Sequence, residues 1–489
     1  MISRRTALLA GSAGVLAAAG GGVYLAARDK PEPPAPPSLD ANKRLLWRNW
    51  SGIEHAYPAV RSAPKSEAEV AQALKASTAP VRVVGAGHSF TGLVPTSGTL
   101  MTLDGLAGIE RWEGDQPVVR AGMRLGALGP ALAERGRAMA NLPDINKQSL
   151  GGCLGTATHG TGATIKAIHG DVTALRLATA TGELIDCDAT QNADVFNAAR
   201  VSLGALGVIT QVRLATSANR RLHRKVFVEP FEETLAKAET RWAQHRNYEF
   251  YAVPFTDLAA NITHDETDAP AMARGPDTDT AFLEVLKQLR NLTRFSTPLR
   301  KSAAKALLGS AKPEEAIDEG WKLLSTERPV RFNEMEFHIP VENHLTALKE
   351  VVATIEAKRP DVFFPIEVRR IAADDAWLSP FQGGPRGSIA VHCHYKDQYD
   401  FLFDLIQPIF LKHGGRPHWG KLHSLKAREL ALLYPNWNDF LAVRRRRRQA
   451  VAQELSVLYP NWNDFLAVRA RLDPQGRLLN PYLKALFGV

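Results

Sequence analysis

The chain has 489 residues, of which 45% are hydrophobic and 23% charged, and it contains 37 glycines, 30 prolines and three cysteines. This is the composition of a globular protein of about two to four domains. It excludes a disordered or collagen-like chain and a bundle of membrane helices, and so few cysteines exclude a disulfide scaffold. Of the formal net charge of +9, Arg4 and Arg5 supply two and the run Arg444–Arg448 supplies five. The rest of the chain is nearly neutral, so a basic surface spread over the whole fold is excluded.

The first residues are typical of an export signal. Ser3-Arg4-Arg5-Thr6 precedes an uncharged apolar stretch, Ala7–Ala27, and this pattern is typical of the twin-arginine route. An uncleaved membrane anchor is the alternative, since about 20 apolar residues can span a bilayer; a buried core helix is less favoured. Residues 1–27 are therefore predicted to engage the twin-arginine export machinery, and the protein to be periplasmic or anchored facing the periplasm. The proline-rich residues 28–40 are predicted to form a stiff linker.

Residues 41–218 alternate short apolar β-rich runs with glycine, which predicts a first α+β domain. A helix is predicted at Met123–Met139, where leucines recur at helical spacing. Thr181-Gly182 between two strand patterns predicts a hairpin. The predicted strands are Val81–Val84, Thr99–Leu103, Pro117–Arg120, Val172–Ala178, Glu183–Cys187 and Ile209–Leu214.

Residues 219–415 are richer in charged and aromatic side chains and predict a second α+β domain. Its clearest strand patterns are Met335–Ile339, Val362–Arg369 and Ile389–Tyr395.

A repeat lies near the C-terminus, where residues 429–444 recur almost unchanged as residues 454–469. A single pair is not a solenoid, and both a recent duplication and a sequence-assembly error remain open. Only the second copy continues into Arg471–Arg477, so we expect the second copy to pack natively and the first to be partly redundant. The arginines between the copies are then a solvated surface, because no aromatic side chains alternate with them as nucleic-acid binding would require.

Three glycine-rich segments let the backbone approach a ligand. The first, Val83–Phe90, follows a strand but lacks the third glycine and the helix of a dinucleotide fingerprint, and glycine turns after strands are common. The second, Gln148–Gly162, offers many hydroxyl and amide donors with little bulk, which suits a flat polar ligand; a glycine-rich surface loop is the alternative. The third is Ser202–Ile209.

Two strand patterns carry ionisable side chains on one face. Because side chains alternate along a strand, Glu367 and Arg369 share one face, and His392 and His394 share one face of the next strand. From the residues alone, Glu367 and Arg369 are either a structural ion pair or part of a reactive site.

Taken together, these motifs resemble the vanillyl-alcohol-oxidase superfamily of flavoenzymes, and within it the sugar-lactone and alditol oxidase branch, which includes D-arabinono-1,4-lactone oxidase. The resemblance implies an α+β fold with a two-subdomain, PCMH-type FAD-binding domain at residues 41–218 and an α+β substrate (cap) domain at residues 219–415. Residues 416–489 would return to the flavin domain and complete the active site. The segments that carry the resemblance are Pro58–Ala76, Gly85–Phe90, Leu142–Gly162, Leu203–Leu214, Glu367–Arg369, Pro417–Lys421 and Leu472–Tyr482.

The resemblance implies FAD as the cofactor, with its pyrophosphate on Gly85–Ser89 and its isoalloxazine near Ser149–Gly160. In this branch a histidine at the position of His88 commonly carries the flavin through its 8α-methyl group, so a covalent bond to His88 is predicted. The predicted cofactor-binding residues are Gly85, Ala86, Gly87, His88, Ser89, Phe90, Ser149, Gly152, Cys153, Thr156, His159, Gly160, Val208 and Ile209.

The resemblance also implies the catalytic groups Glu367, Arg369 and Lys421. Oxidising an alcohol sends hydride to flavin N5 while the hydroxyl loses a proton, so positive charge is needed at the developing oxyanion. Glu367 would orient or deprotonate the hydroxyl. The predicted substrate-binding residues are Ser149, His394 and His418. Since His394 stands where the alditol-oxidase pattern has a small hydroxyl residue, an alditol is the less favoured substrate.

The sequence therefore predicts an exported FAD-dependent oxidoreductase of a sugar lactone or polyol, with O2 as electron acceptor. One alternative is a periplasmic dehydrogenase that passes electrons to a cytochrome or quinone. The other is a membrane-tethered basic binding protein that uses Arg444–Arg448. No nucleic-acid partner and no metal are predicted. A metal site of His392, His394, His418 and His423 is a minor alternative that no fixed ligand spacing supports.

Overall fold

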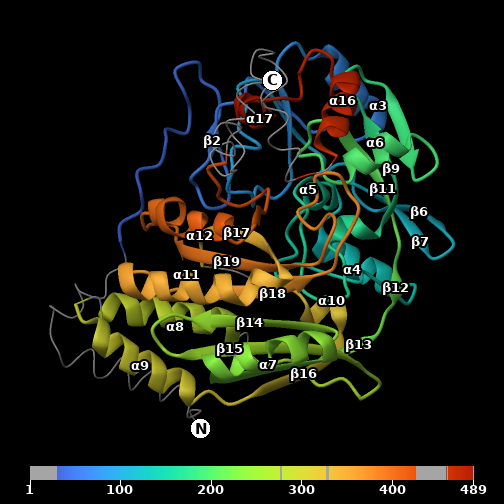
Figure 1. The fold of residues 1–489 in the computed structure, drawn as a ribbon. Coiled ribbons are helices and arrows are strands. Elements are labelled where there is room, and N and C mark those ends of the chain that lie inside the picture. Colours follow the sequence, from blue (N-terminus) through green and yellow to red (C-terminus); the bar gives the residue numbers. More distant parts are fainter. Residues whose placement is uncertain are drawn as a thin grey trace, which may run out of the picture.

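The computed structural model describes residues 30–275, 278–293, 295–326, 330–425, 459 and 461–487. The predicted export signal at residues 1–27, the arginine run Arg444–Arg448 and the first repeat copy at residues 429–444 lie outside them and stay predictions. The described chain forms two parts, each built on β-sheets, that meet over a cavity (Figure 1). No helix in these described ranges combines the length and the apolar character that crossing a membrane requires.

The first part begins with a small parallel sheet in the order β3-β5-β4. β4 (Val81–Val84) leads directly into the first glycine-rich segment, as predicted. α3 (Glu67–Ala76) precedes it and begins at Ser66, whose side chain accepts a hydrogen bond from the N–H of Glu69. The other strands of this region are β1 (Trp47–Arg48), β2 (His55–Ala56), β3 (Val60–Ser62) and β5 (Thr99–Thr102).

Five antiparallel strands form the second sheet of the first part, in the order β10-β9-β11-β7-β6. The predicted hairpin is confirmed as β9 (Val172–Ala178) and β10 (Leu184–Asp188). Gly182 lies in the turn between them with φ of +82°, a backbone angle that glycine adopts without strain. The other elements are β6 (Ile109–Glu113), β7 (Gln116–Arg120), α4 (Leu125–Ala133), β8 (Arg137–Ala138), α5 (Leu150–Gly155), η1 (Ile168–Asp171), α6 (Ala193–Ala199), β11 (Val208–Leu214) and β12 (Ser217–Ala218).

The second part is built on an eight-stranded antiparallel sheet in the order β16-β13-β15-β14-β18-β19-β17-β20. Its strands are β13 (Arg221–Pro230), β14 (Asn247–Val253), β15 (Leu258–Thr267), β16 (Glu314–Glu319), β17 (Phe332–Pro340), β18 (Ile366–Ile371), β19 (Arg386–His394) and β20 (Arg416–Pro417). Its helices are α7 (Phe231–Gln244), α8 (Thr278–Leu292), α9 (Thr297–Gly309), α10 (Gly320–Leu323), η2 (Val341–Asn343), α11 (His344–Lys358), η3 (Leu402–Ile406) and α12 (Gln407–Lys412).

The alternation of side chains along these strands gives the sheet two chemically different faces. On one face Phe250 packs against Trp242 of α7, and Phe337 stacks on Phe410 of α12 with ring centroids 5.1 Å apart. The residues beside them in sequence point the other way, so strands such as β14 and β17 present carboxylates to the first part of the chain. The helices cover the apolar face, and the polar face is left to form a site.

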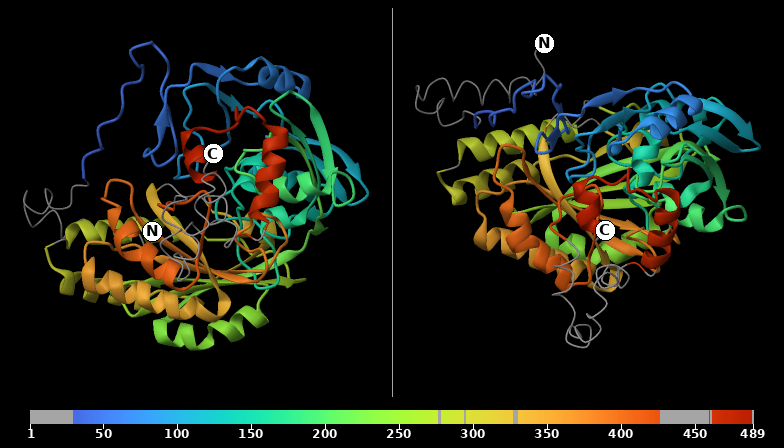
Figure 2. Two further views of the ribbon diagram at one scale, coloured as in Figure 1. Left: turned by 45° about the horizontal axis from the view of Figure 1, so that its top comes forward. Right: turned by 90° about the horizontal axis from the view of Figure 1, so that it is seen from above.

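The C-terminal helices α16 (Trp462–Leu472) and α17 (Pro481–Phe487) return to the first part, beside its blue and green segments (Figure 2). Tyr459, Trp462 and Phe465, which belong to the second repeat copy, are fully buried. The second copy therefore packs into the fold, as its continuation into Arg471–Arg477 predicted.

A buried arginine holds this C-terminal return in place. Arg82 of β4 donates hydrogen bonds to the carbonyl oxygens of Leu93, Leu203 and Leu478 at 2.6, 2.7 and 2.8 Å. Burial lowers the pKa of Arg82 to about 10, which still leaves it charged at neutral pH. One guanidinium thus joins three stretches of chain that are far apart in sequence.

β17 and β19 each begin three residues before the predicted strands, and two other predicted elements are shorter than predicted. The helix predicted at Met123–Met139 ends at Ala133, because Gly136 follows with φ of +65° and Arg137 begins the short strand β8. The strand predicted at Val362–Arg369 begins only at Ile366, since Pro365 has no N–H to donate to a sheet.

Replacing Arg82 tests the C-terminal clamp. We expect Arg82→Met to lower the unfolding free energy by about 3 kcal/mol or more, because three buried carbonyl groups lose a charged donor. A fall in the thermal midpoint would measure this loss. Arg111→Met is the matched control, since the Arg111 side chain is 49% exposed in surface ion pairs and its loss should change the midpoint little.

Candidate active site

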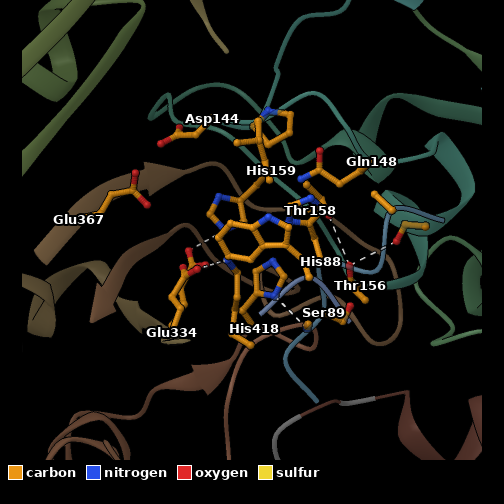
Figure 3. Close-up of a pocket in the computed structure, with 18 of the residues that line it drawn as sticks. His88, Ser89, Asp144, Gln148, Thr156, Thr158, His159, Glu334, Glu367 and His418 are labelled. Carbon is orange, nitrogen blue, oxygen red and sulfur yellow. Dashed lines mark hydrogen bonds and ion pairs between the residues drawn. The ribbon is translucent and has the colours of Figure 1, made fainter. Parts of the chain in front are cut away.

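A cavity of about 420 Å³ lies between the glycine-rich segments of the first part and the polar face of the eight-stranded sheet. Figure 3 shows His88, Gln148, Thr156 and His159 on one side of it, and Glu334 and Glu367 on the other. The structure therefore brings together residues more than 200 positions apart in sequence.

The first and second glycine-rich segments touch each other at one wall of this cavity. A Cβ added to Gly85 would lie only 2.3 Å from Oγ of Ser149, and one added to Gly152 would lie 3.0 Å from the same oxygen. Any larger residue at Gly85 would displace Ser149, so glycine is needed for close approach and not merely for flexibility.

His88 is held at the cavity wall by stacking on Trp50, with ring centroids 4.9 Å apart. Burial, together with the positive charges of Lys421 and Arg124, lowers the pKa of His88 to about 4. The imidazole is therefore neutral at physiological pH, and its unprotonated nitrogen keeps a free electron pair.

Glu367 and Arg369 lie side by side on β18 and face the cavity, as the alternation predicted. Both are buried, and Arg369 donates a hydrogen bond to Glu367. Two more carboxylates approach the same guanidinium, Asp144 at 3.7 Å and Glu249 at 3.9 Å. Burial opposes the charge on Arg369, but the surrounding carboxylates, Asp144 foremost, outweigh it and raise its pKa.

Tyr251 links this group to the first part of the chain. Its hydroxyl lies 2.9 Å from Oδ2 of Asp144 and also hydrogen-bonds to Glu367. Because Asp144 precedes the second glycine-rich segment, this contact fixes the position of β18 relative to that segment.

Lys421 forms a second charged group with Glu334 and His392. Lys421 donates a hydrogen bond to Glu334, and Nε2 of His392 lies 3.6 Å from the other oxygen of that carboxylate. Nδ1 of His392 lies 3.2 Å from the carbonyl oxygen of Pro365, which can only accept, so this nitrogen carries the proton. Burial lowers the pKa of His392, although Glu334 partly opposes the shift.

Behind these groups, His159 pairs with Glu336 of β17. Its Nε2 lies 3.0 Å from the Glu336 carboxylate and its Nδ1 lies 2.8 Å from the carbonyl oxygen of Gly160. Burial alone would raise the pKa of Glu336, but His159, and at greater distance His418 and Arg369, hold that pKa well below its usual range.

Comparison with known proteins assigns the family. Residues 212–448 and 447–486 match the family model described as D-arabinono-1,4-lactone oxidase, and residues 58–188 match the model described as FAD binding domain. The chain is 34% identical over 458 residues to L-gulono-1,4-lactone dehydrogenase of Mycobacterium tuberculosis, an alignment that covers 91% of this chain and 99% of that protein. The chain belongs to the sugar-lactone oxidase family of FAD-dependent enzymes.

Other relatives agree with this family and with its fold. L-gulonolactone oxidase of Bos taurus is 29% identical over 462 residues, which are 91% of this chain and 99% of that one. The crystal structure of cholesterol oxidase from B. sterolicum superimposes with a TM-score of 0.72 at 17% identity, covering 94% of this chain and 100% of that one. The fold is thus the predicted α+β fold with an FAD-binding domain. The two matches to the lactone-oxidase model meet at residues 447–448, between the repeat copies.

As a sugar-lactone oxidase family member, the chain is an FAD-dependent oxidoreductase that acts on CH–OH groups. The residues of the cavity fit FAD. Gly85 and Gly152 leave room that a Cβ would fill, and Oε1 of Gln148 is buried with no protein partner. A buried, unpaired amide oxygen beside hydroxyl donors such as Thr156 suits the polar edge of a flavin ring.

Most of the residues predicted for the site line the cavity. They come from all three glycine-rich segments, from β18 and from the stretch after β20. The predicted residues that line it are Gly85, Ala86, Gly87, His88, Ser89, Phe90, Ser149, Gly152, Thr156, His159, Val208, Ile209, Glu367, Arg369, His418 and Lys421.

Three predicted site residues are not among those that line the cavity: Cys153, Gly160 and His394. Cys153 points into the core from α5, where burial raises its pKa to about 12. Gly160 is needed for packing, since a Cβ added at this position would lie 2.1 Å from the carbonyl oxygen of Leu142. His394 packs against Phe364 with ring centroids 5.3 Å apart, and His392 is the histidine of this strand that lines the cavity.

The sequence reasoning missed several ionisable residues of the cavity. Each of them lies at an alternate position of an otherwise apolar strand or beside a predicted segment, which is the same signal that singled out Glu367 and Arg369. They are Asp144, Glu249, Tyr251, Glu334 and Glu336.

The minor histidine metal site is not formed as a unit. Three clusters in the described ranges bring potential ligand atoms within 4.8 Å of one another, and none contains more than one of His392, His394, His418 and His423. Two of these clusters share Glu367 and lie where Arg369 and Lys421 already neutralise the carboxylates.

Conservative changes at the catalytic pair test its role. Glu367→Gln and Arg369→Lys should keep the flavin bound but slow its reduction by substrate about 10²–10⁴-fold, since each removes one charge or one fork-shaped donor from the cavity. Stopped-flow absorbance of the flavin measures this rate. Glu239→Gln is the control, because Glu239 pairs with Arg370 on the opposite face of β18 and its change should leave the rate intact. An unchanged rate in Glu367→Gln would remove that residue from the chemistry.

Proposed function

We propose that this enzyme oxidises a secondary alcohol of an aldono-1,4-lactone and passes the electrons to O2. The family model and the relatives named lactone oxidases or lactone dehydrogenases support the substrate class. The observation that carries the proposal is the buried Glu367–Arg369 pair, which lies beside Glu334 and its partner Lys421 in one cavity. Such a site offers paired donors and acceptors to a compact, polyhydroxylated molecule.

The bound flavin supplies the acceptor for hydride in this chemistry. Arg369 and Lys421 place positive charge where the substrate hydroxyl develops negative charge. Glu367 accepts hydrogen bonds from Arg369 and Tyr251, which fix the position of its carboxyl group. Each of its oxygens keeps a further lone pair that can accept the substrate hydroxyl and align its C–H bond.

His392 and His418 complete the substrate side of the cavity. Nδ1 of His418 accepts a hydrogen bond from the N–H of Gly420 at 3.0 Å, which leaves its Nε2–H as a donor. Burial lowers the pKa of His418 to about 3, so this ring is neutral during turnover. Neutral histidines add hydrogen-bonding specificity without adding to the charge of Arg369 and Lys421.

A bleaching screen tests the substrate class. Under anaerobic conditions we expect aldono-1,4-lactones to bleach the flavin of the holoenzyme, and alditols and aldoses to leave it oxidised, because the family model and the relatives are named for lactones. Absorbance of the flavin is the measurement. Bleaching by alditols alone would contradict the proposal. One molecule of peroxide formed per lactone in air would identify O2 as the acceptor, and bleaching without peroxide would point to another carrier.

We also propose that His88 carries the flavin covalently. Its neutral ring at the cavity wall, held by Trp50, would form the C–N bond to the 8α carbon. The C–H bond lost there would give up a proton and leave two electrons on the flavin, which O2 would then take up. Acid precipitation of the native holoenzyme should therefore give a yellow pellet, whereas His88→Ala should release its flavin into the supernatant. His55→Ala, an exposed histidine outside the cavity, is the control and should keep a yellow pellet. Complete release from the unmodified enzyme would refute the bond.

A further inference from the structure

Tyr251 lies between two carboxylates that line the cavity. Its hydroxyl is 2.9 Å from Oδ2 of Asp144 and also hydrogen-bonds to Oε1 of Glu367. A phenol carries one hydrogen atom, so at any moment it donates to only one of these carboxylates, and it can accept a proton from the other through its oxygen. The hydroxyl is therefore placed to take a proton from one carboxyl group while it gives its own to the other.

The two carboxylates differ in their access to water. The side chain of Glu367 is 4% exposed, whereas that of Asp144 is 21% exposed. Asp144 also lies close in sequence to the exposed Lys147, on the loop that leads to the second glycine-rich segment. Figure 3 shows both carboxylates at the same end of the cavity. The two carboxylates and the hydroxyl between them thus lead from a buried group to a more accessible one.

Arg369 contacts both ends of this line. It donates a hydrogen bond to Glu367 and lies 3.7 Å from Oδ1 of Asp144, and Glu249 approaches it from β14 at 3.9 Å. Each of the three carboxylates has an oxygen atom within 4.8 Å of one on the other two. Carboxylates this close together in a buried site hold a proton between them more readily than a single carboxylate does. The surroundings of Tyr251 therefore favour movement of a proton among these groups.

We propose that Tyr251 relays the proton of the substrate hydroxyl from Glu367 to Asp144, and that Asp144 releases it to water. The inference rests on the proposed function, in which Glu367 accepts the substrate hydroxyl. A carboxyl group that kept this proton could not take one from the next substrate molecule, so the buried Glu367 needs an outlet. Tyr251 is then a relay residue that acts through Glu367 and does not itself touch the reacting atoms.

The proton moves in three steps. Glu367 takes the hydroxyl proton while the hydrogen on the same substrate carbon leaves as hydride for the bound flavin, so both electrons leave with the hydride. Glu367 then passes a proton to the oxygen of Tyr251, and Tyr251 passes its own hydroxyl proton to Asp144. Asp144 finally gives this proton to water. Both carboxylates are then ionised and the phenol is protonated, as at the start.

Proton release measured beside flavin reduction tests the relay. The holoenzyme is mixed anaerobically with a lactone that bleaches it, in weak buffer with a pH indicator, and stopped-flow absorbance follows the flavin and the indicator together. In the unmodified enzyme we expect proton release to keep pace with reduction. In Tyr251→Phe and in Asp144→Asn, release should lag behind reduction about 10²-fold, because the outlet from Glu367 is broken.

Tyr57→Phe and Asp268→Asn are the matched controls. The hydroxyl of Tyr57 donates to the carbonyl oxygen of Pro37, and the side chain of Asp268 is 99% exposed. Neither residue lines the cavity, so proton release should keep pace with reduction in both variants.

Chemical rescue gives a second readout. Asp144→Ala removes the outlet and leaves space in which formate can stand in for the lost carboxylate. As the formate concentration rises, proton release in this variant should return to the pace of reduction, whereas chloride at the same ionic strength should have no effect. A freely diffusing acid does not replace a side chain that only positions Glu367, so a lack of rescue would overturn Asp144 as the outlet.

The failure of the relay and the failure of the proposed function give different results. If no lactone or other alcohol reduces the flavin of the unmodified enzyme, the proposed function fails and the relay fails with it. If the unmodified enzyme is reduced and proton release keeps pace with reduction in Tyr251→Phe, the relay alone is overturned. Equal slowing of reduction and release in Tyr251→Phe and Asp144→Asn also overturns the relay, because both side chains would then only position Glu367.

Discussion

The geometry of the whole site depends on hydrogen bonds that join the second glycine-rich segment to the sheet of the second part. The N–H of Gly162 donates to the carbonyl oxygen of Arg370 at 2.7 Å, and Oγ1 of Thr161 donates to the carbonyl oxygen of Tyr248 at 2.8 Å. The side chain of Asn247 returns a hydrogen bond to Thr161. These bonds are buried; one joins two backbone groups, and the other two need the side chains of Thr161 and Asn247. They set the distance between the flavin-binding wall and the strand that carries Glu367 and Arg369.

Buried charge is the second constraint on this site. Three carboxylates of the polar face of the eight-stranded sheet each have a named partner: Glu367 has Arg369, Glu334 has Lys421, and Glu336 has His159. Glu249 and Asp144 share Arg369 with Glu367. Removing one partner would leave an unpaired charge in a medium of low dielectric constant. The pairs therefore hold one another in position, and this keeps Arg369, Lys421 and Glu367 at the cavity wall.

Much of the fold and of the site could be predicted because local patterns carried it. Period-two alternation placed Glu367 with Arg369, and glycine density marked the segments around Gly85 and Ser149. Glu334 and Glu336 also share one face of a strand, but acidic residues at alternate positions of a strand are as easily solvated side chains. The alternation alone therefore does not place these two residues at the cavity. His394 was predicted for the substrate side from its place in the alditol-oxidase pattern, whereas the structure places His392 at the cavity and packs both rings against Phe364.

The sequence by itself determined the α+β fold, the position of the glycine-rich segments and the shared face of Glu367 and Arg369, because backbone conformation and side-chain direction depend on near neighbours. Only the tertiary structure decided which residues meet. Asp144 and Tyr251 are 107 positions apart and touch, and Arg82 contacts Leu478 across 396 positions. Such contacts depend on how the two sheets pack and where the C-terminus returns. A local sequence pattern does not specify contacts between residues so far apart in the chain.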